Sequence, residues 1–332
     1  MHAHWTPRGL AQASAAGREW YGLRLEREPG GREVIVFGAH KLAFPASASL
    51  LTDPAARAAR RKASDGVDFE ALLLTGTFWN YHLDEPTSAR YCREVNEEIA
   101  EVQQAYPDRF RGMAILPMQH RKVALSELDH AVNRLGLRTI AIGTNVSGLN
   151  LDEGPILSTL ELAAKMGVSI VVHPTSWTKA GEARFPRHNF VNSFGSPLED
   201  SLAVMSIVYS GLLDRHPDLR IMFTHGGGWI HFGIGRLNLR YHQSGNGRPM
   251  AHAPADYLGR MYFDCLVHDE HSLALLKTRA GAEHIVIGTD YPGSGDIRGG
   301  AVNWIRTCGQ FSDEEQRNVL WNNAASFLDL PR

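Results

Sequence analysis

The sequence predicts an α/β fold, a TIM-like (β/α)8 barrel whose first strand is cut short. Short runs of β-branched and large aliphatic residues recur along the chain, and each closes at a glycine or proline. Such runs are typical of strands buried on both faces. Amphipathic stretches lie between them, and strands that alternate with helices form parallel sheets with right-handed crossovers. The 332 residues suit one large barrel.

Seven strands are predicted after residue 60, and an eighth would complete a barrel. The remaining candidate is the N-terminus, of which only the last turn of a strand is visible. The predicted strands are 69–76, 110–117, 137–144, 168–174, 219–227, 261–267 and 284–292.

Helical periodicity fills the intervals between these strands. Ser312 and Glu315 have the spacing of a capping box at the start of the last helix. An Ala- and Arg-rich stretch at 54–63 predicts a further helix that leads into the strand at 69–76. The predicted helices are 87–106, 122–135, 153–166, 197–214, 229–242, 269–279 and 312–329.

Residues 19–45 interrupt this alternation. EWYGLRLE, EPGGRE and VIVFGAHKLAF follow one another there, and the Pro-Gly-Gly turn predicts a β-hairpin. We expect one barrel domain over 1–332, with 19–45 as a small β insertion near the barrel mouth.

Composition excludes several partners. The net charge of −2 favours neither nucleic acid nor an acidic membrane. The three cysteines, Cys92, Cys265 and Cys308, have no paired or CxxC spacing, which indicates reduced thiols. No run approaches transmembrane length. We therefore expect a cytoplasmic protein with a small-molecule substrate.

Several predicted strands end in side chains that bind metals. His173 follows SIVV, His225 follows IMFT and Asp290 follows VIGT. In a parallel barrel the carboxyl ends of the strands carry the active site. Any one of these residues alone is more often structural, but three strand ends together indicate function. With His2 and His4 they supply nitrogen and carboxylate donors suited to zinc or manganese, and His225 is a candidate general acid or base.

His2 and His4 raise a separate question. Alternate side chains of a strand point to one face, so His-x-His is a good metal-binding pair. Only Met1 precedes the pair here, which leaves little strand to support it. We expect that the natural protein begins upstream, and that His2 and His4 are poorly ordered or only partly occupied by metal.

The motifs HAH, HPTSW, FTHGGG and GTDYPG together resemble the metal-dependent amidohydrolase superfamily. The resemblance is to the branch of 2-amino-3-carboxymuconate-6-semialdehyde decarboxylase and related aromatic-acid decarboxylases. It is extended by GMAILPMQ, IGTNVSGLNL and FDCLVHD, and it runs from residue 2 to WNNAASFLDL.

This resemblance implies a role for each matching residue. His2, His4, His173 and Asp290 would hold one divalent metal, zinc or manganese, with no organic cofactor. A single ion is implied because IAIGTN ends in Asn145, where two-metal relatives carry a lysine. His225 would be the acid/base residue beside the metal. Arg236 resembles an arginine that grips a substrate carboxylate across a dimer interface; the alternative for Arg236 is a salt bridge on a helix surface.

The resemblance also implies a non-oxidative decarboxylase that releases CO2 from a small aromatic or conjugated unsaturated acid. The proton would reach the carbon that bears the carboxylate through His225 or from Asp290. VIVFGAHKLAF lacks the arginine that muconate-semialdehyde enzymes carry in this hairpin, which argues against that substrate. Candidate substrate-binding residues are Phe78, Trp79, Trp177, Phe190, Phe194 and His268, the last without an assigned role; core packing is the alternative for each aromatic residue.

Two other functions stay open. A hydrolase or hydratase could use the same metal site, and loss of CO2 or gain of water would distinguish the reactions. A binding or regulatory protein with little metal is the alternative from another class, and the metal content per chain would identify it.

Overall fold

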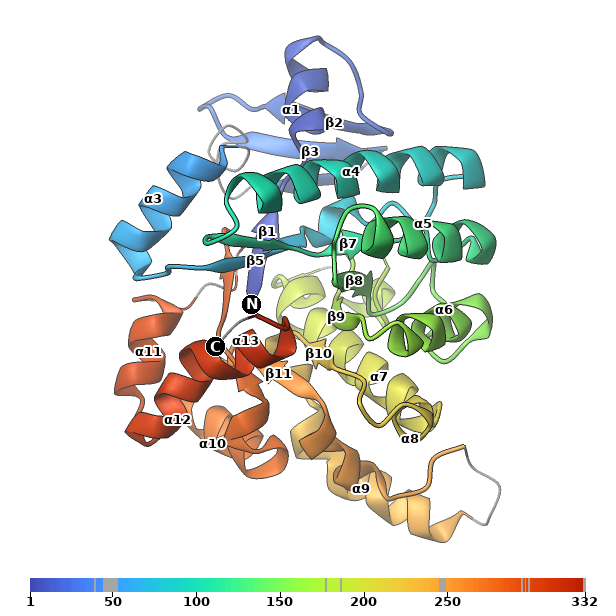
Figure 1. Cartoon of the computed structure of the whole chain (residues 1–332), viewed down its shortest axis with the longest axis vertical. Helices are drawn as coiled ribbons and strands as arrows, with labels where there is room; N and C mark the ends of the chain where they lie inside the picture. Colours follow the sequence, from blue (N-terminus) through green and yellow to red (C-terminus); the bar gives the residue numbers. More distant parts are fainter. Residues whose placement is uncertain are drawn as a thin grey trace.

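The computed structural model describes residues 1–38, 40–43, 53–176, 178–185, 187–244, 249–293, 295, 297 and 299–330. Parallel strands occupy the centre and helices lie around them (Figure 1). The strands are β1 (His2–Trp5), β5 (Glu70–Leu74), β6 (Phe110–Gly112), β7 (Ala114–Ile115), β8 (Thr139–Gly143), β9 (Ser169–His173), β10 (Ile221–Phe223), β11 (Tyr262–Asp264), β12 (Ile285–Val286) and β13 (Gly288–Tyr291).

The strand order confirms the predicted (β/α)8 fold. One sheet runs β13-β1-β5-β6 and the other runs β12-β11-β10-β9-β8-β7. Each sheet continues into the other along the chain, because β6 and β7 are separated by Met113 alone and β12 and β13 by Ile287 alone. All seven strands predicted after residue 60 are present.

The N-terminal strand corrects one expectation. β1 has four residues and pairs on both sides, with β5 through Ala3, His4 and Trp5 and with β13 through His2 and Ala3. His2 and His4 are both buried. The prediction of a pair on a poorly ordered end is therefore wrong, because strand neighbours from both ends of the chain hold it in place.

The helices cover the outside of the strands (Figure 1). The Ser312 capping box is formed, but the predicted helix over 312–329 is divided, because a π-helical turn at Asn318–Asn322 separates α12 from α13. The helices are α1 (Arg8–Ala15), α3 (Pro54–Asp65), α4 (Glu85–Ala105), α5 (Arg121–Asn133), α6 (Gly154–Lys165), α7 (Ser196–Tyr209), α8 (Leu212–Arg215), α9 (Ile230–Gln243), α10 (Glu270–Ala280), α11 (Ala301–Thr307), α12 (Asp313–Arg317) and α13 (Asn323–Phe327).

The predicted hairpin is present and is extended by a third strand. β2 (Leu23–Arg27) pairs antiparallel with β3 (Glu33–Phe37), which pairs with β4 (His40–Ala43). The ring of Phe37 lies 4.5 Å from that of His82, in the loop after β5. The insertion therefore contacts the loops at the carboxyl ends of the strands.

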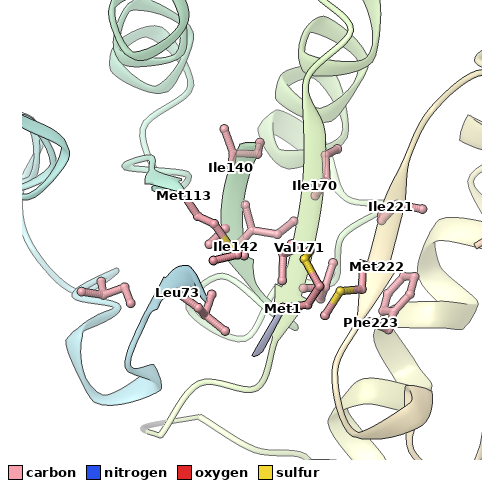
Figure 2. Packing of buried hydrophobic residues seen from close by; sticks show 14 of the residues in the cluster. Met1, Leu73, Met113, Ile140, Ile142, Ile170, Val171, Ile221, Met222 and Phe223 are labelled. Atoms are coloured by element: carbon pink, nitrogen blue, oxygen red, sulfur yellow. The ribbon is translucent and has the colours of Figure 1, made fainter. Parts of the chain in front are cut away.

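The core lies between the strands and around them. Figure 2 shows Met113, Ile142, Val171 and Met222 packed together between the strands that carry them. Leu72, Leu73 and Leu74 are consecutive and all fully buried, which means that both faces of β5 are covered. This double burial is the reason why these strands appear as continuous apolar runs.

Candidate metal centre and active site

The histidines of β1 point the same way because alternate side chains of a strand share a face. Their Nε2 atoms lie 3.3 Å apart. Asp290, on β13, places its Oδ1 2.8 Å from His4 Nε2 and 3.3 Å from His2 Nε2. The two neighbouring strands thus bring three of the predicted ligands together.

His173 and His225 complete the cluster. The ring of His173, at the end of β9, lies 4.9 Å from the rings of both His2 and His4. The ring of His225, after β10, lies 5.1 Å from that of His2. One ligand atom from each of His2, His173, His225 and Asp290 lies within 4.8 Å of the others. This spacing is suited to a single ion.

Three of the four histidines are oriented through Nδ1. Nδ1 of His2 donates to Asp264 Oδ2 at 2.7 Å, and Nδ1 of His173 donates to the carbonyl of Pro174 at 2.7 Å. Nδ1 of His225 donates to Asp200 Oδ2 at 2.9 Å. Because each acceptor can only accept, these bonds set the tautomer and leave Nε2 free toward the cluster, as in histidine metal sites.

Electrostatics also fit a cation in this cluster. Burial opposes the charge of Asp290, but hydrogen bonds from His2 and His4 hold the pKa of its carboxyl well below the usual value. Burial and cationic neighbours hold the pKa of His173 well below the usual value, so its imidazole is neutral. For His2, hydrogen bonds to Asp264 and Asp290 outweigh burial and raise the pKa to about 9.

His225 stands in a strained turn. Its φ is 50°, and Gly226, Gly227 and Gly228 follow with φ of 60°, 72° and 66°. A Cβ at Gly228 would lie 1.8 Å from the carbonyl oxygen of Pro197, so this position requires glycine. Burial opposes protonation of His225, but the charge of Asp200 outweighs it and raises the pKa of the imidazole. The turn presents a basic histidine at the edge of the metal cluster.

A cavity of about 540 Å³ opens beside the cluster. His225 and Asp290 contribute to its wall, together with Trp229 and Phe232 at the start of α9 and Leu266 after β11. His268 also lines this cavity. Trp229 was not among the predicted residues.

The other predicted substrate-binding residues do not line this cavity. Phe78 is fully buried, with its ring 6.2 Å from that of Trp20, and it packs in the core. Phe190 and Phe194 lie in the exposed turn Val191–Gly195 or next to it, and the ring of Phe194 lies 5.8 Å from that of Trp229. Trp177 lies outside the described residues.

Three further predicted positions have clear surroundings. Arg236 is exposed on α9 and is not among the residues that line the cavity. Trp79 is buried, with its ring 6.4 Å from that of His173. Asn145, after β8, donates to Glu199 Oε2 at 2.7 Å and to the carbonyl of Thr178 at 3.0 Å, so it acts in a hydrogen-bond network beside the site.

Asp200 and Asp264 were not predicted at all. Asp264 ends β11 and also accepts from the backbone N–H of Gly226 at 3.0 Å, so it connects His2 to the turn of His225. Its one sequence signal is its place in FDCLVHD. Asp200 lies inside α7, where nothing in the local sequence distinguishes it from a surface carboxylate.

No helix in the described part of the chain is long and apolar enough to cross a membrane.

Known proteins are similar to this chain in sequence and in fold. The model of the amidohydrolase family matches residues 1–330. A 2-amino-3-carboxymuconate-6-semialdehyde decarboxylase of Dictyostelium discoideum is 34% identical over 273 residues, which cover 80% of this chain and 74% of that protein.

Solved structures of decarboxylases are also similar to this chain. A 5-carboxyvanillate decarboxylase from Sphingomonas paucimobilis matches with a TM-score of 0.77 and 25% identity, over 86% of each chain. A dihydroxybenzoic acid decarboxylase from Polaromonas, solved with manganese and the inhibitor 2-nitroresorcinol, matches in fold with a TM-score of 0.79 and 21% identity, over 99% of this chain and 96% of the other. The chain belongs to the amidohydrolase family.

Proposed function

We propose that this chain is a metal-dependent, non-oxidative decarboxylase, a carboxy-lyase acting on a small aromatic or conjugated unsaturated carboxylic acid. The observation that carries the proposal is the convergence of His2, His4, His173 and Asp290 beside a histidine–aspartate pair in the wall of a cavity. The names of the relatives favour carbon–carbon cleavage over hydrolysis.

One divalent ion would be held by His2, His4, His173 and Asp290. The donor set of imidazoles and one carboxylate suits zinc or manganese, and manganese is present in the Polaromonas structure. Such an ion would act as a Lewis acid toward an oxygen of the substrate. Asp264 and the Pro174 carbonyl keep His2 and His173 in the tautomer that ligation requires.

His225 would deliver the proton. Asp200 holds its Nδ1, so the proton that moves is the one on Nε2, which faces the cluster. The bond between the carboxylate and its carbon breaks, CO2 leaves, and the electron pair left on that carbon takes the proton. Asp290 is the weaker donor, because the low pKa of its carboxyl keeps it ionised. The reaction consumes one proton for each CO2.

The cavity suits a planar acid. Trp229, Leu266 and Val267 give it apolar walls, and His225 and His268 add polar groups. We also propose a homodimer in which Arg236 of one copy reaches the substrate carboxylate of the other, since Arg236 stands exposed on α9 beside an apolar surface.

The test is metal-dependent CO2 release. Protein loaded with zinc or manganese is incubated with a panel of hydroxy- and amino-aryl acids, and products are identified by mass. We expect loss of CO2 from at least one acid. His225→Asn is expected to lower kcat by about 10²- to 10⁴-fold while the bound metal per chain stays at the wild-type value.

Other outcomes would contradict the proposal. A product that gains water would indicate a hydrolase or hydratase. A metal content near zero per chain after metal-supplemented expression would contradict both the decarboxylase and the hydrolase or hydratase, and it would favour a binding protein.

A further inference from the structure

Side chains of helix α3 contact β1 and β13, the two strands that carry three of the four candidate ligands. Arg57 and Arg61, one turn apart on α3, are both buried. The guanidinium of Arg57 donates to both oxygens of Glu70 on β5, at 2.9 and 3.0 Å. Its third contact is the backbone carbonyl of His4, to which Nη1 donates at 2.6 Å. A buried cation thus bonds to the main chain of a candidate metal ligand.

The carbonyl of His4 needs this donor. Carbonyls alternate in direction along a strand, and that of Trp5 points to β5, where it accepts from the N–H of Thr75 at 3.2 Å. The carbonyl of His4 therefore faces the β13 side. β13 ends at Tyr291, whose N–H donates to Thr289 Oγ1. Pro292 has no N–H, and the N–H of Gly293 donates to the carbonyl of Asp290 instead. Arg57 supplies the hydrogen bond that the strand ladder lacks at this position.

The same helix face also holds β13. The guanidinium carbon of Arg61 lies 4.0 Å from the centre of the Tyr291 ring, and that of Arg57 lies 5.2 Å from it. Arginine over a tyrosine face is an attractive contact. Tyr291 directly follows Asp290, so α3 touches both strands that bring His4 Nε2 and Asp290 Oδ1 to 2.8 Å from each other.

Stability alone is a poor explanation for this arrangement. A buried ion pair is often no more stabilising than well-packed apolar residues of similar volume. Burial opposes the charge of Glu70, but the Arg57 guanidinium outweighs it and holds the pKa of the carboxyl below its usual value. An apolar pair could fill the same space, but it could not donate to the His4 carbonyl.

We propose that Arg57, paired with Glu70, is a positioning residue that fixes His4 at the spacing the metal requires, with Arg61 steadying Asp290 through Tyr291. The inference rests on the proposed function only in that the cluster binds a metal. Arg57 touches neither metal nor substrate in this role, and acts through the backbone of β1.

The test separates positioning from folding. Arg57→Met alone leaves Glu70 buried without its main partner, so the informative variant is Arg57→Met/Glu70→Met, in which both charges are absent. Arg57→Lys keeps a charge but cannot bond to both Glu70 oxygens and the His4 carbonyl at once. The matched control is Arg93→Met, which breaks the ion pair of Arg93 with buried Glu127 between α4 and α5, where Nη2 and Oε2 are 2.8 Å apart.

The readouts are the zinc dissociation constant from competition with a chelating dye, the visible spectrum of the cobalt-substituted protein, and folding by circular dichroism. We expect the double variant to fold, to bind zinc about ten-fold or more weakly and to show a changed cobalt spectrum. Arg57→Lys should show a smaller increase in the same dissociation constant, and Arg93→Met none.

Wild-type zinc affinity and cobalt spectrum in both Arg57→Lys and the double variant would overturn the proposal. If the double variant fails to fold, Arg57→Lys decides by the same two measurements. A wild-type chain that binds no metal would overturn this proposal and the proposed function together. Metal binding without CO2 release would overturn the proposed reaction alone, because positioning is judged by affinity and not by turnover.

Discussion

The metal cluster and the outer surface of α9 lie on two sides of one cavity. They differ in how far their side chains are buried and paired within the chain. In the cluster, the Nδ1 atoms of His2, His173 and His225 each have a hydrogen-bond partner. The α9 surface, which we define as Phe194, Trp229, Phe232 and Leu239, exposes large apolar side chains, with Phe232 88% exposed.

The contrast separates a site that one chain forms by itself from a surface that a second molecule could cover. The cluster needs only the strand ends of one copy, whereas an apolar surface beside a cavity marks a place where something else packs. α9 lies at the periphery of the molecule (Figure 1), and Trp229 and Phe232 belong both to its surface and to the cavity wall. Changes in the cluster should therefore affect metal binding, and changes on the α9 surface should affect assembly.

The largest effect is expected inside the cluster. Asp264→Asn replaces the acceptor that sets the tautomer of His2 and holds the N–H of Gly226. We expect the metal dissociation constant to rise about 10- to 100-fold, measured by competition with a chelating dye. Asp269→Asn is the control, because Asp269 caps α10 at the surface. An unchanged dissociation constant in Asp264→Asn would show that the orientation of His2 does not depend on this carboxylate.

A smaller effect, on assembly and not on metal content, is expected from the α9 surface. Phe232→Glu places a charge where we propose that a second copy packs, and burial of a phenylalanine contributes about 1.5–3 kcal/mol. We expect sedimentation velocity to show a shift toward monomer at micromolar concentration, with metal content unchanged. Leu149→Glu changes an apolar residue that is 44% exposed in the loop after β8 and should leave assembly intact. Dimers of equal stability in both variants would place the interface elsewhere.

The smallest effect concerns Asp214 on α8, which contacts the segment that follows α9. Asp214 accepts from the hydroxyl of Tyr257 at 2.6 Å and from the N–H of Ala251 at 2.9 Å. Burial opposes its charge, but these bonds and Arg260 lower the pKa of the carboxyl below 3.8. A lowered folded-state pKa stabilises the fold above pH 3.8, and this contribution disappears as the pH falls through the folded value.

Asp214→Asn should therefore lower the free energy of unfolding by about 1 kcal/mol near neutral pH. The difference from wild type should shrink as the pH falls below 3.8, and metal affinity should not change. Chemical denaturation at a series of pH values measures both trends. A difference that stays constant down to pH 3 would mean that the charge of Asp214 contributes nothing.

The strand ends could be predicted because their signal is local. His173, His225 and Asp290 each close an apolar run that is buried on both faces, and parallel strands bring such ends together. That β1 is well ordered could not be predicted, since the strands that pair with it, β5 and β13, lie far along the chain. Asp264 and Asp200 were missed for a similar reason, because their partners are 262 and 25 residues away.

The aromatic residues show where composition misleads. Phe78 and Trp79 are neighbours in sequence, yet Phe78 packs against Trp20 in the core and Trp79 approaches His173. Only the path of the short turn after β5 decides between them. Residue type alone predicted an aromatic pocket, and the structure assigns its wall to Trp229 and Phe232 instead.

The place of β1 between β5 and β13 also has a consequence for synthesis of the protein. His2 and His4 are translated about 285 residues before the strand that completes their ladder and supplies Asp290. At ordinary translation rates the interval is roughly 15 to 60 s. During that time one edge of β1 has no strand partner and is open to wrong pairing. We expect metal capture to come after translation of β13, and the nascent chain to depend on chaperones until then.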